Sequence, residues 1–249
     1  MNDSDLNRLL KVASQARSVA VLTGAGMSRE SGIPTFRGAD GLWKDFRPEE
    51  LASPEAFQKD PALVWEWYEW RRQIVLKAEP HEGHRVVAAM EQRFPEFLLI
   101  TQNVDGLHPR AGNEKLIEIH GSINRARCTK CGSRFDLGNR MLSDLPLKCD
   151  CGALARPDVV WFGESYDSQL LSASLDFLAS ADMVWVIGSS GMVSVPVYLA
   201  AQAREAGAFL VDLNPEEAEF SRYCDLKIRS TAGAALPSFW NALTGGRTE

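Results

Sequence analysis

The chain has 249 residues, of which 45% are hydrophobic and 24% are charged, a composition typical of a globular protein and not of a disordered or collagen-like one. Lys and Arg number 27 against 33 Asp and Glu, so the net charge of −6 makes nucleic acid an unlikely direct ligand. No apolar run approaches about 18 residues, so no membrane span is expected. The first residues resemble no signal peptide, which predicts a cytoplasmic location.

Short apolar runs alternate with helical patterns along the chain. The runs cover residues 19–22, 97–100, 116–119, 183–187 and 209–213, and the helical patterns cover 6–16, 84–93, 168–179 and 197–206. Apolar runs that end in glycine or polar residues are typical of buried parallel strands. The alternation therefore predicts an α/β fold with a Rossmann-like, doubly wound parallel sheet.

Two stretches interrupt this alternation. Residues 36–80 show no clear strand and hold four of the seven tryptophans, and residues 122–157 hold four of the five cysteines. We interpret both as insertions that form a small lobe, the first helical and the second a zinc-binding module. The Rossmann-like domain is then expected from residues 1–35, 81–121 and 158–249.

The four clustered cysteines have the spacing of metal ligands. Cys128 and Cys131 form a C-x-x-C pair, and Cys149 and Cys151 follow after 17 residues as a C-x-C pair. Such a cluster in a cytosolic chain favours a closed, structural Cys₄ zinc site over disulfides. Free buried thiols are the alternative. A redox centre is disfavoured because neither pair opens a helix after a strand.

A glycine-rich loop, Gly24-Ala25-Gly26, directly follows the first predicted strand. Glycines there allow close approach of a diphosphate, and the next helix would offer free N–H groups. An ordinary glycine turn explains the fragment equally well. A dehydrogenase is disfavoured because Arg29 replaces the third glycine of that fingerprint and no acidic residue follows at the ribose position.

Polar motifs follow the next two predicted strands. TQNVDGLH spans residues 101–108, and His120 lies in the sequence IHGS. Amide and carboxylate side chains at a strand end suit recognition of a sugar and a carboxamide. Imidazole is partly neutral at pH 7 and suits a general base. Taken singly, a polar loop and a structural histidine remain the alternatives.

Together these motifs resemble those of the sirtuins, NAD-dependent protein deacylases. The string GAGMSRESGIPTFRG from Gly24 to Gly38, TQNVDGLH and HGS all match that family, and the resemblance extends from about residue 10 to residue 240. Three departures occur: Ser189 stands where the family has Thr, the family proline aligns with Val195 although Pro196 follows, and Ser230 replaces a glycine.

The resemblance implies NAD as co-substrate and one structural zinc ion. The implied NAD-binding residues are Gly24, Ala25, Gly26, Ser28, Ile33, Phe36, Arg37, Gln102, Asn103, Asp105, Gly188, Ser189, Ser190, Val193, Asn214, Pro215 and Ala232. It further implies that the oxygen of an acyl-lysine attacks C1′ of the nicotinamide ribose. Asn103 and Asp105 would position ribose and carboxamide, and His120 would be the general base on a ribose hydroxyl. The products would be nicotinamide, free lysine and O-acyl-ADP-ribose.

The run VVWFGE resembles the substrate segment of sirtuins. Val160, Trp161, Phe162, Gly163 and Glu164 are therefore expected to bind an acyl-lysine protein or peptide, with the run as an exposed strand edge to which the peptide adds.

Tyr68 and Arg71 are three residues apart in the predicted helix 61–77 and so share one face. Packing of a long arginine stem on an amphipathic helix is the alternative reading. The spacing is that of the sirtuin branch that removes succinyl and malonyl groups, and Ala56 lies where that branch has a small residue. The sequence thus predicts removal of acetyl and acidic acyl groups. The other candidates are a mono-ADP-ribosyltransferase and a non-catalytic NAD-sensing scaffold.

Overall fold

A six-stranded sheet forms the centre of the larger lobe. The computed structural model describes residues 3–34, 48–192 and 194–245. The strands of this sheet are β1 (Ser18–Thr23), β2 (Glu96–Thr101), β3 (Leu116–Glu118), β7 (Met183–Ile187), β8 (Phe209–Leu213) and β9 (Leu226–Ile228). Their order is β3-β2-β1-β7-β8-β9, and every neighbouring pair is parallel. The predicted α/β fold with a parallel sheet is confirmed.

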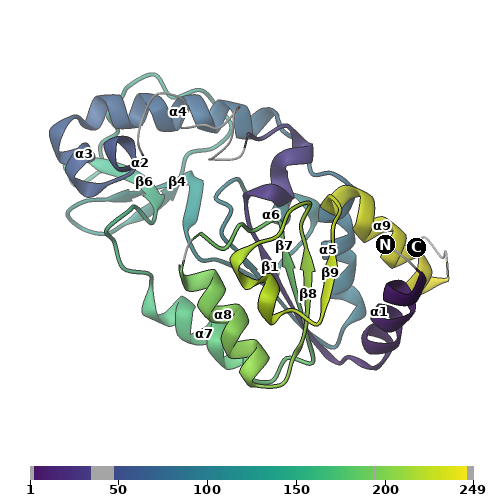
Figure 1. Ribbon diagram of the computed structural model, residues 1–249. Helices are drawn as coiled ribbons and strands as arrows, with labels where there is room; N and C mark the ends of the chain where they lie inside the picture. Colours follow the sequence, from purple (N-terminus) through teal and green to yellow (C-terminus); the bar gives the residue numbers. More distant parts are fainter. Residues whose placement is uncertain (1–2, 35–47, 193, 246–249) are drawn as a thin grey trace.

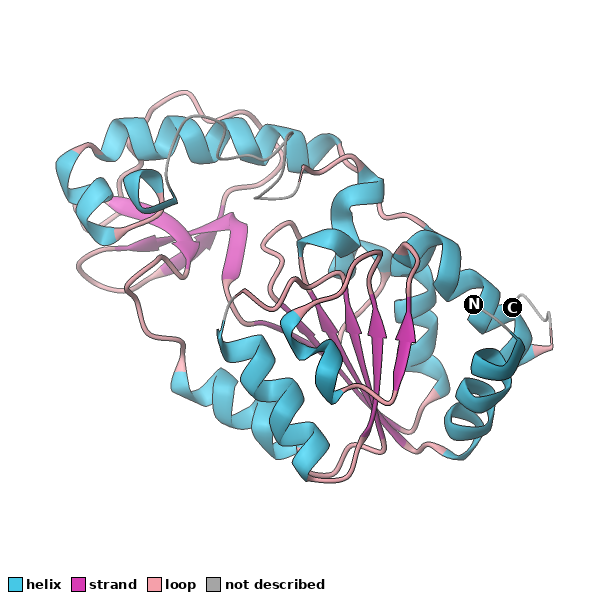
Figure 2. Ribbon diagram, in the orientation of Figure 1, coloured by secondary structure: helices cyan, strands magenta, loops and turns pink. Residues whose placement is uncertain are grey.

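Helices cover both faces of this sheet (Figures 1 and 2). One face packs against α1 (Asp3–Gln15), α5 (Glu82–Arg93) and α9 (Ala232–Thr244), and the other against α7 (Ser168–Leu178) and α8 (Ser194–Glu205). Short helices η1 (Ala25–Ser31), α6 (Leu107–Ala111) and η2 (Glu219–Tyr223) follow strand ends. Strand β9 and helix α9 were not among the elements predicted from the sequence.

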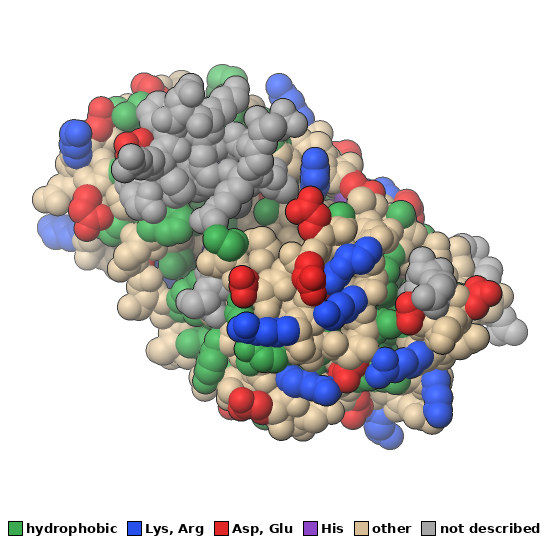
Figure 3. Space-filling view, in the orientation of Figure 1, with side chains coloured by type: hydrophobic (Ala, Val, Ile, Leu, Met, Phe, Trp, Pro, Cys, Tyr) green, Lys and Arg blue, Asp and Glu red, His purple; other side chains and the backbone are tan. Residues whose placement is uncertain are grey.

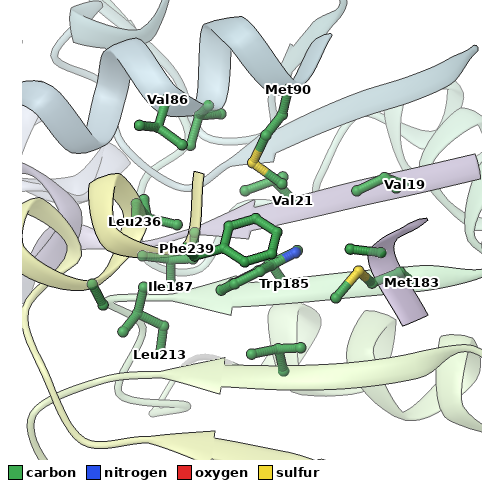
Figure 4. Close-up of a cluster of buried hydrophobic side chains, with 14 of the residues drawn as sticks. Val19, Val21, Val86, Met90, Met183, Trp185, Ile187, Leu213, Leu236 and Phe239 are labelled. Atoms are coloured by element: carbon green, nitrogen blue, oxygen red, sulfur yellow. The ribbon is translucent and has the colours of Figure 1, made fainter. Parts of the chain in front are cut away.

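The alternation of side chains along β1 explains why its sequence is apolar throughout. Val19 and Val21 join the hydrophobic cluster beneath α5 and α9, whereas Ala20 and Leu22 join the cluster beneath α7 and α8. In the first cluster Trp185 packs on Phe239, with ring centroids 4.9 Å apart (Figure 4).

The smaller lobe lies beyond one end of this sheet, in the upper part of Figure 1. It combines an antiparallel sheet of β4 (Gly121–Cys128), β5 (Arg134–Asp136) and β6 (Ala155–Val159) with α2 (Pro48–Leu51), α3 (Pro54–Lys59) and α4 (Pro61–Lys77). Helix α4 begins where Asp60 accepts a hydrogen bond from the Leu63 N–H and Pro61 occupies the first turn. Its bounds are those predicted.

The domain boundaries drawn from the sequence stay a prediction, although the strands divide close to them. All six strands of the parallel sheet lie within 1–35, 81–121 and 158–249, while β4 starts at Gly121 and β6 ends at Val159. Within the described ranges, no helix has the length and apolar character that crossing a bilayer requires. On the face shown in Figure 3, Lys and Arg side chains are interspersed with Asp and Glu.

Candidate active site

The predicted NAD-binding segments gather at one edge of the parallel sheet. The chain passes from β1 outward to β2 and β3, and then returns to β7 on the other side of β1. In open α/β sheets, ligands bind beyond the carboxyl ends of the strands at such a switch point. The glycine-rich loop, TQNVDGLH and the segment 188–190 follow β1, β2 and β7, so the topology brings them to this crevice.

The glycines of the loop are needed for contact with a second loop. Gly24 N–H donates to the Ile187 carbonyl (3.0 Å) and Gly26 N–H to the Gly188 carbonyl (2.8 Å). A Cβ on Gly26 would lie 2.8 Å from the Gly188 Cα, and Gly188 itself has φ +61°. Packing of two loops is thus a reason for these glycines beyond the diphosphate and the turn that the sequence suggests. The helix that follows is a 3₁₀ helix, η1.

A buried polar network joins three predicted NAD-binding residues. Asn103 Nδ2 donates to the Gly24 carbonyl (3.0 Å) and to Ser28 Oγ (3.1 Å). Ser28 Oγ donates to Asp105 Oδ2 (2.7 Å), whose other oxygen accepts the Leu107 N–H (2.9 Å). Burial raises the pKa of Asp105, and these two hydrogen bonds oppose the shift. The network fixes the amide and the carboxylate at the crevice.

His120 lies two residues beyond β3 and is held through Gln102. Its Nδ1 is 3.0 Å from the backbone carbonyl oxygen of Gln102. A carbonyl oxygen only accepts, so Nδ1 carries the proton and Nε2 has the lone pair. Gln102 Nε2 in turn donates to Ser189 Oγ (3.0 Å). Burial lowers the pKa of His120, while the Gln102 carbonyl raises it. The half-buried ring is thereby available as a neutral base.

Tyr166 is a site residue that the sequence analysis missed. Its hydroxyl oxygen lies 3.0 Å from His120 Nε2. The residue is 46 positions from His120 in sequence and belongs to none of the matched motifs, so only its place just after VVWFGE hinted at the site.

The segments after β7 and β8 line a separate cavity. A cavity of about 470 Å³ is lined by Ser190, Met192, Glu217, Ala218, Glu219 and Arg222. Asn214 Nδ2 donates to the fully buried Asp212 (2.5 Å), while Pro215 is exposed. Ala232 is buried at the start of α9. The predicted contacts Phe36, Arg37 and Val193 lie outside the described residues.

Tyr68 and Arg71 lie together on α4, as their spacing predicts. The Arg71 guanidinium carbon is 5.4 Å from the Tyr68 ring centroid, and Trp161 Nε1–H donates to the Tyr68 oxygen (2.8 Å). Arg71 also lines a small pocket together with Ser28, Asn103 and Asp105. Burial lowers its pKa, and the nearby Tyr68 and Asp105 oppose the shift. Arg71 of the smaller lobe thus reaches the polar residues of the larger one.

The prediction that residues 160–164 form an exposed strand edge is wrong. Strand β6 ends at Val159, and the N–H groups of the next three residues are already used. Val160 N–H donates to the His120 carbonyl (2.9 Å), Phe162 N–H to the Ala52 carbonyl (3.0 Å), and Trp161 N–H to the Glu164 carboxylate (2.8 Å). The strand stops because the chain turns toward α3, with Gly163 at φ +83°.

This turn nevertheless lies beside His120 and partly faces solvent, as a peptide-binding segment requires. The Val160 hydrogen bond joins it to His120, and Phe162 keeps 44% of its surface exposed. Glu164 pairs with Arg156 (2.5 Å) and Arg127 (3.2 Å) and accepts the Trp161 N–H, so its carboxylate stabilises the turn. Ala56 is half-buried against the same hydrophobic cluster as Trp161.

The four clustered cysteines fit one tetrahedral metal ion. Their sulfur atoms all lie within 4.8 Å of one another, with Cys128 and Cys151 at 3.4 Å and Cys131 and Cys149 at 3.7 Å. Zn–S bonds of about 2.3 Å require sulfur separations of about 3.8 Å in a tetrahedron. The Lys130 and Cys131 N–H groups also point at Cys128 Sγ. This geometry suits a closed structural zinc site.

The fold and site define a protein with a dinucleotide crevice and a four-cysteine lobe. The Sir2 family profile matches residues 24–195. An NAD-dependent protein deacylase of Aquifex aeolicus (strain VF5) is 48% identical over 227 residues, 91% of this chain and 95% of the relative. The chain belongs to the Sir2 family.

Solved structures agree with this assignment. The crystal structure of a Sir2 homologue–NAD complex has a TM-score of 0.91 at 41% identity and covers 96% of this chain, with 94% of its own chain aligned. A Sir2 protein with a deacetylated p53 peptide and 3′-O-acetyl-ADP-ribose has a TM-score of 0.85 at 30% identity, over 98% of this chain and 99% of its own.

Proposed function

We propose that this protein is an NAD-dependent lysine deacylase that removes acetyl groups and also succinyl and malonyl groups from protein or peptide substrates. Its family membership supports the deacylase reaction. The observation that carries the acidic-acyl preference is the Tyr68–Arg71 pair, buried on α4 beside the pocket of Asn103 and Asp105.

The chemistry of this pair suits a carboxylate. A planar guanidinium binds a carboxylate through two parallel N–H bonds, and a charge-assisted hydrogen bond is about twice as strong as a neutral one. Because Trp161 already donates to the Tyr68 oxygen, the hydroxyl proton of Tyr68 is free for another acceptor. A succinyl or malonyl carboxylate would thus meet two donors, whereas an acetyl group would meet neither.

The remaining site residues divide the work of the reaction. The co-substrate NAD supplies the ribose carbon to which the acyl oxygen is transferred. Asn103 and the Ser28–Asp105 pair hold the nicotinamide end, and the cavity beside Ser190 suits the adenosine end. His120 takes a proton from a ribose hydroxyl through its unprotonated Nε2. Trp161 and Phe162 contact the lysine stem, since they lie on the turn joined to His120 through Val160.

A panel of lysine peptides tests this function. Acetyl, propionyl, malonyl, succinyl and glutaryl versions of one peptide are incubated with NAD and analysed by mass spectrometry. We expect free lysine peptide, nicotinamide and O-acyl-ADP-ribose from the acetyl, malonyl and succinyl peptides. A peptide carrying ADP-ribose would instead indicate a mono-ADP-ribosyltransferase, and the absence of nicotinamide release would indicate an NAD-sensing scaffold.

A further inference from the structure

The unprotonated nitrogen of His120 already has a partner in the protein. Nδ1–H is committed to the Gln102 carbonyl, so Nε2 is the single nitrogen able to take a proton. Tyr166 Oη lies 3.0 Å from that atom, and the two rings are tilted by 44° with centroids 5.4 Å apart. The lone pair of Nε2 therefore accepts the Tyr166 O–H.

This contact affects how a substrate hydroxyl reaches the base. A neutral imidazole nitrogen has one lone pair and accepts one proton. A ribose hydroxyl must therefore either displace Tyr166 or transfer its proton through it. The Tyr166 hydroxyl can accept one proton and donate another at the same time. The Gln102 carbonyl contacts the other ring nitrogen and has no proton to donate to Nε2.

We propose that Tyr166 is a catalytic residue that relays the proton between the ribose hydroxyl and His120. The ribose O–H bond breaks as its proton passes to Tyr166 Oη. The original Tyr166 proton passes to Nε2, so that an N–H bond forms and His120 becomes imidazolium. The ribose oxygen keeps its electron pair and bonds to the acyl carbon, while the π electrons between that carbon and the lysine nitrogen move onto the nitrogen. Tyr166 begins and ends as a neutral phenol.

The surroundings of both side chains keep each in the protonation state from which the transfer starts. Tyr166 is half-buried, and burial raises the pKa of its hydroxyl, which keeps the phenol protonated at neutral pH. Burial also lowers the pKa of His120, which keeps the imidazole neutral before the transfer. The new imidazolium then has an acceptor on each nitrogen, the Gln102 carbonyl at Nδ1 and Tyr166 Oη at Nε2.

Tyr166 lies outside the turn of residues 160–164, so a substitution at this position should leave that turn unchanged. It follows the turn of residues 160–164 and precedes α7, which begins at Ser168 after an Asp167 cap. Its ring packs at the edge of the hydrophobic cluster beneath α7 and α8. A phenylalanine at this position would keep that packing and remove only the hydroxyl group.

The experiment compares wild type with Tyr166→Phe in single turnovers with NAD and an acetyl-lysine peptide. This inference depends on the deacylase function proposed above, so nicotinamide release and O-acyl-ADP-ribose formation are followed separately. We expect nicotinamide release to change less than about two-fold and O-acyl-ADP-ribose formation to slow roughly 100-fold, at the lower end of the range for a lost acid–base group.

Rates measured in mixtures of H₂O and D₂O show how many protons are transferred in the rate-limiting step. For O-acyl-ADP-ribose formation, two moving protons predict a curved dependence on the D₂O fraction in wild type, and one predicts a straight line in Tyr166→Phe. The matched control is Tyr198→Phe, which alters an exposed tyrosine on α8 and should match wild type. The thermal midpoints of all three proteins are measured alongside.

The outcomes separate the relay from the proposed function. Wild-type O-acyl-ADP-ribose formation in Tyr166→Phe, faster formation because the lone pair is unmasked, or the same D₂O dependence in both proteins would each overturn the relay. A wild-type protein that releases no nicotinamide would overturn the deacylase function itself.

Discussion

The two lobes are stabilised by different means. In the larger lobe, β1 and β7 are fully buried strands of a parallel sheet, covered by apolar helices on both faces. In the smaller lobe, ion pairs cross the three-stranded sheet: Arg125 with Asp158 (3.5 Å), and Arg134 with Asp158 (3.2 Å). The four cysteines hold the far end of the same sheet.

This difference suggests that the stability of the fold and the choice of acyl group depend on different lobes. A continuous apolar core stabilises the strand ends where the dinucleotide chemistry is placed. The smaller lobe has fewer buried apolar residues, and we expect it to depend on its metal site and its tryptophan-rich helix. Yet this lobe supplies Tyr68 and Arg71, the side chains that we propose discriminate between acyl groups. Changes in each lobe should therefore have separable effects.

The largest expected effect is loss of the metal site. Structural zinc contributes roughly 10–16 kcal/mol of apparent binding energy in small zinc domains, so Cys128→Ser should unfold the smaller lobe and abolish deacylation. The protein should contain one zinc per chain by metal analysis, and tryptophan fluorescence should report the loss of packing around Trp65 and Trp67. Cys224→Ser, in the larger lobe, is the control and should keep zinc and activity. A zinc-free, folded and active protein would refute the structural role.

Removal of the base should affect chemistry and little else. His120→Tyr is expected to lower kcat by about 10³-fold, within the usual range for a general base, and to leave the thermal midpoint nearly unchanged because the ring is half-buried. Steady-state deacylation and a thermal melt measure the two effects. Full activity in this variant would contradict the assignment of His120.

The next effect belongs to the smaller lobe alone. Arg71→Met should lower kcat/KM for a succinyl peptide by about 100-fold, as expected for loss of a charge-assisted bidentate contact, and for an acetyl peptide by less than about three-fold. Lys77→Met, an exposed position on the same helix, is the control. Equal losses on both peptides would show that Arg71 supports the lobe but does not select the acyl group.

The smallest effect concerns the acid sensitivity of the larger lobe. His84 is fully buried, and burial lowers its pKa to about 2, while His108 falls to about 3. Below pH 6.5 the unfolded chain binds protons that the native state excludes, so stability falls as pH drops from 6.5 toward these values. Each histidine contributes about 1.4 kcal/mol per pH unit.

Thermal midpoints measured from pH 7.5 to pH 5 check this dependence. His84→Phe retains a planar ring without a titrating nitrogen and should show a shallower decline than wild type. Identical slopes in the two proteins would mean that His84 is not buried in its neutral form.

Part of this structure was readable in the sequence because the signals are local. The run 19–22 is apolar on both faces of a strand, and Asp60-Pro61 marks the start of α4. The cysteine spacing specifies a knuckle within a few residues. Strands β4 and β6 gave no such signal, since their arginines and the one aspartate, Asp158, are stabilised by partners across the sheet.

The sequence by itself determined the family motifs, the parallel sheet and the metal ligands, because each depends on residue types at short, fixed spacing. Only the tertiary structure decided that residues 160–164 form a turn, that Gly26 packs against Gly188, and that Tyr166 meets His120. These contacts join segments dozens of residues apart, and their partners are chosen by how the strands are ordered in the sheet.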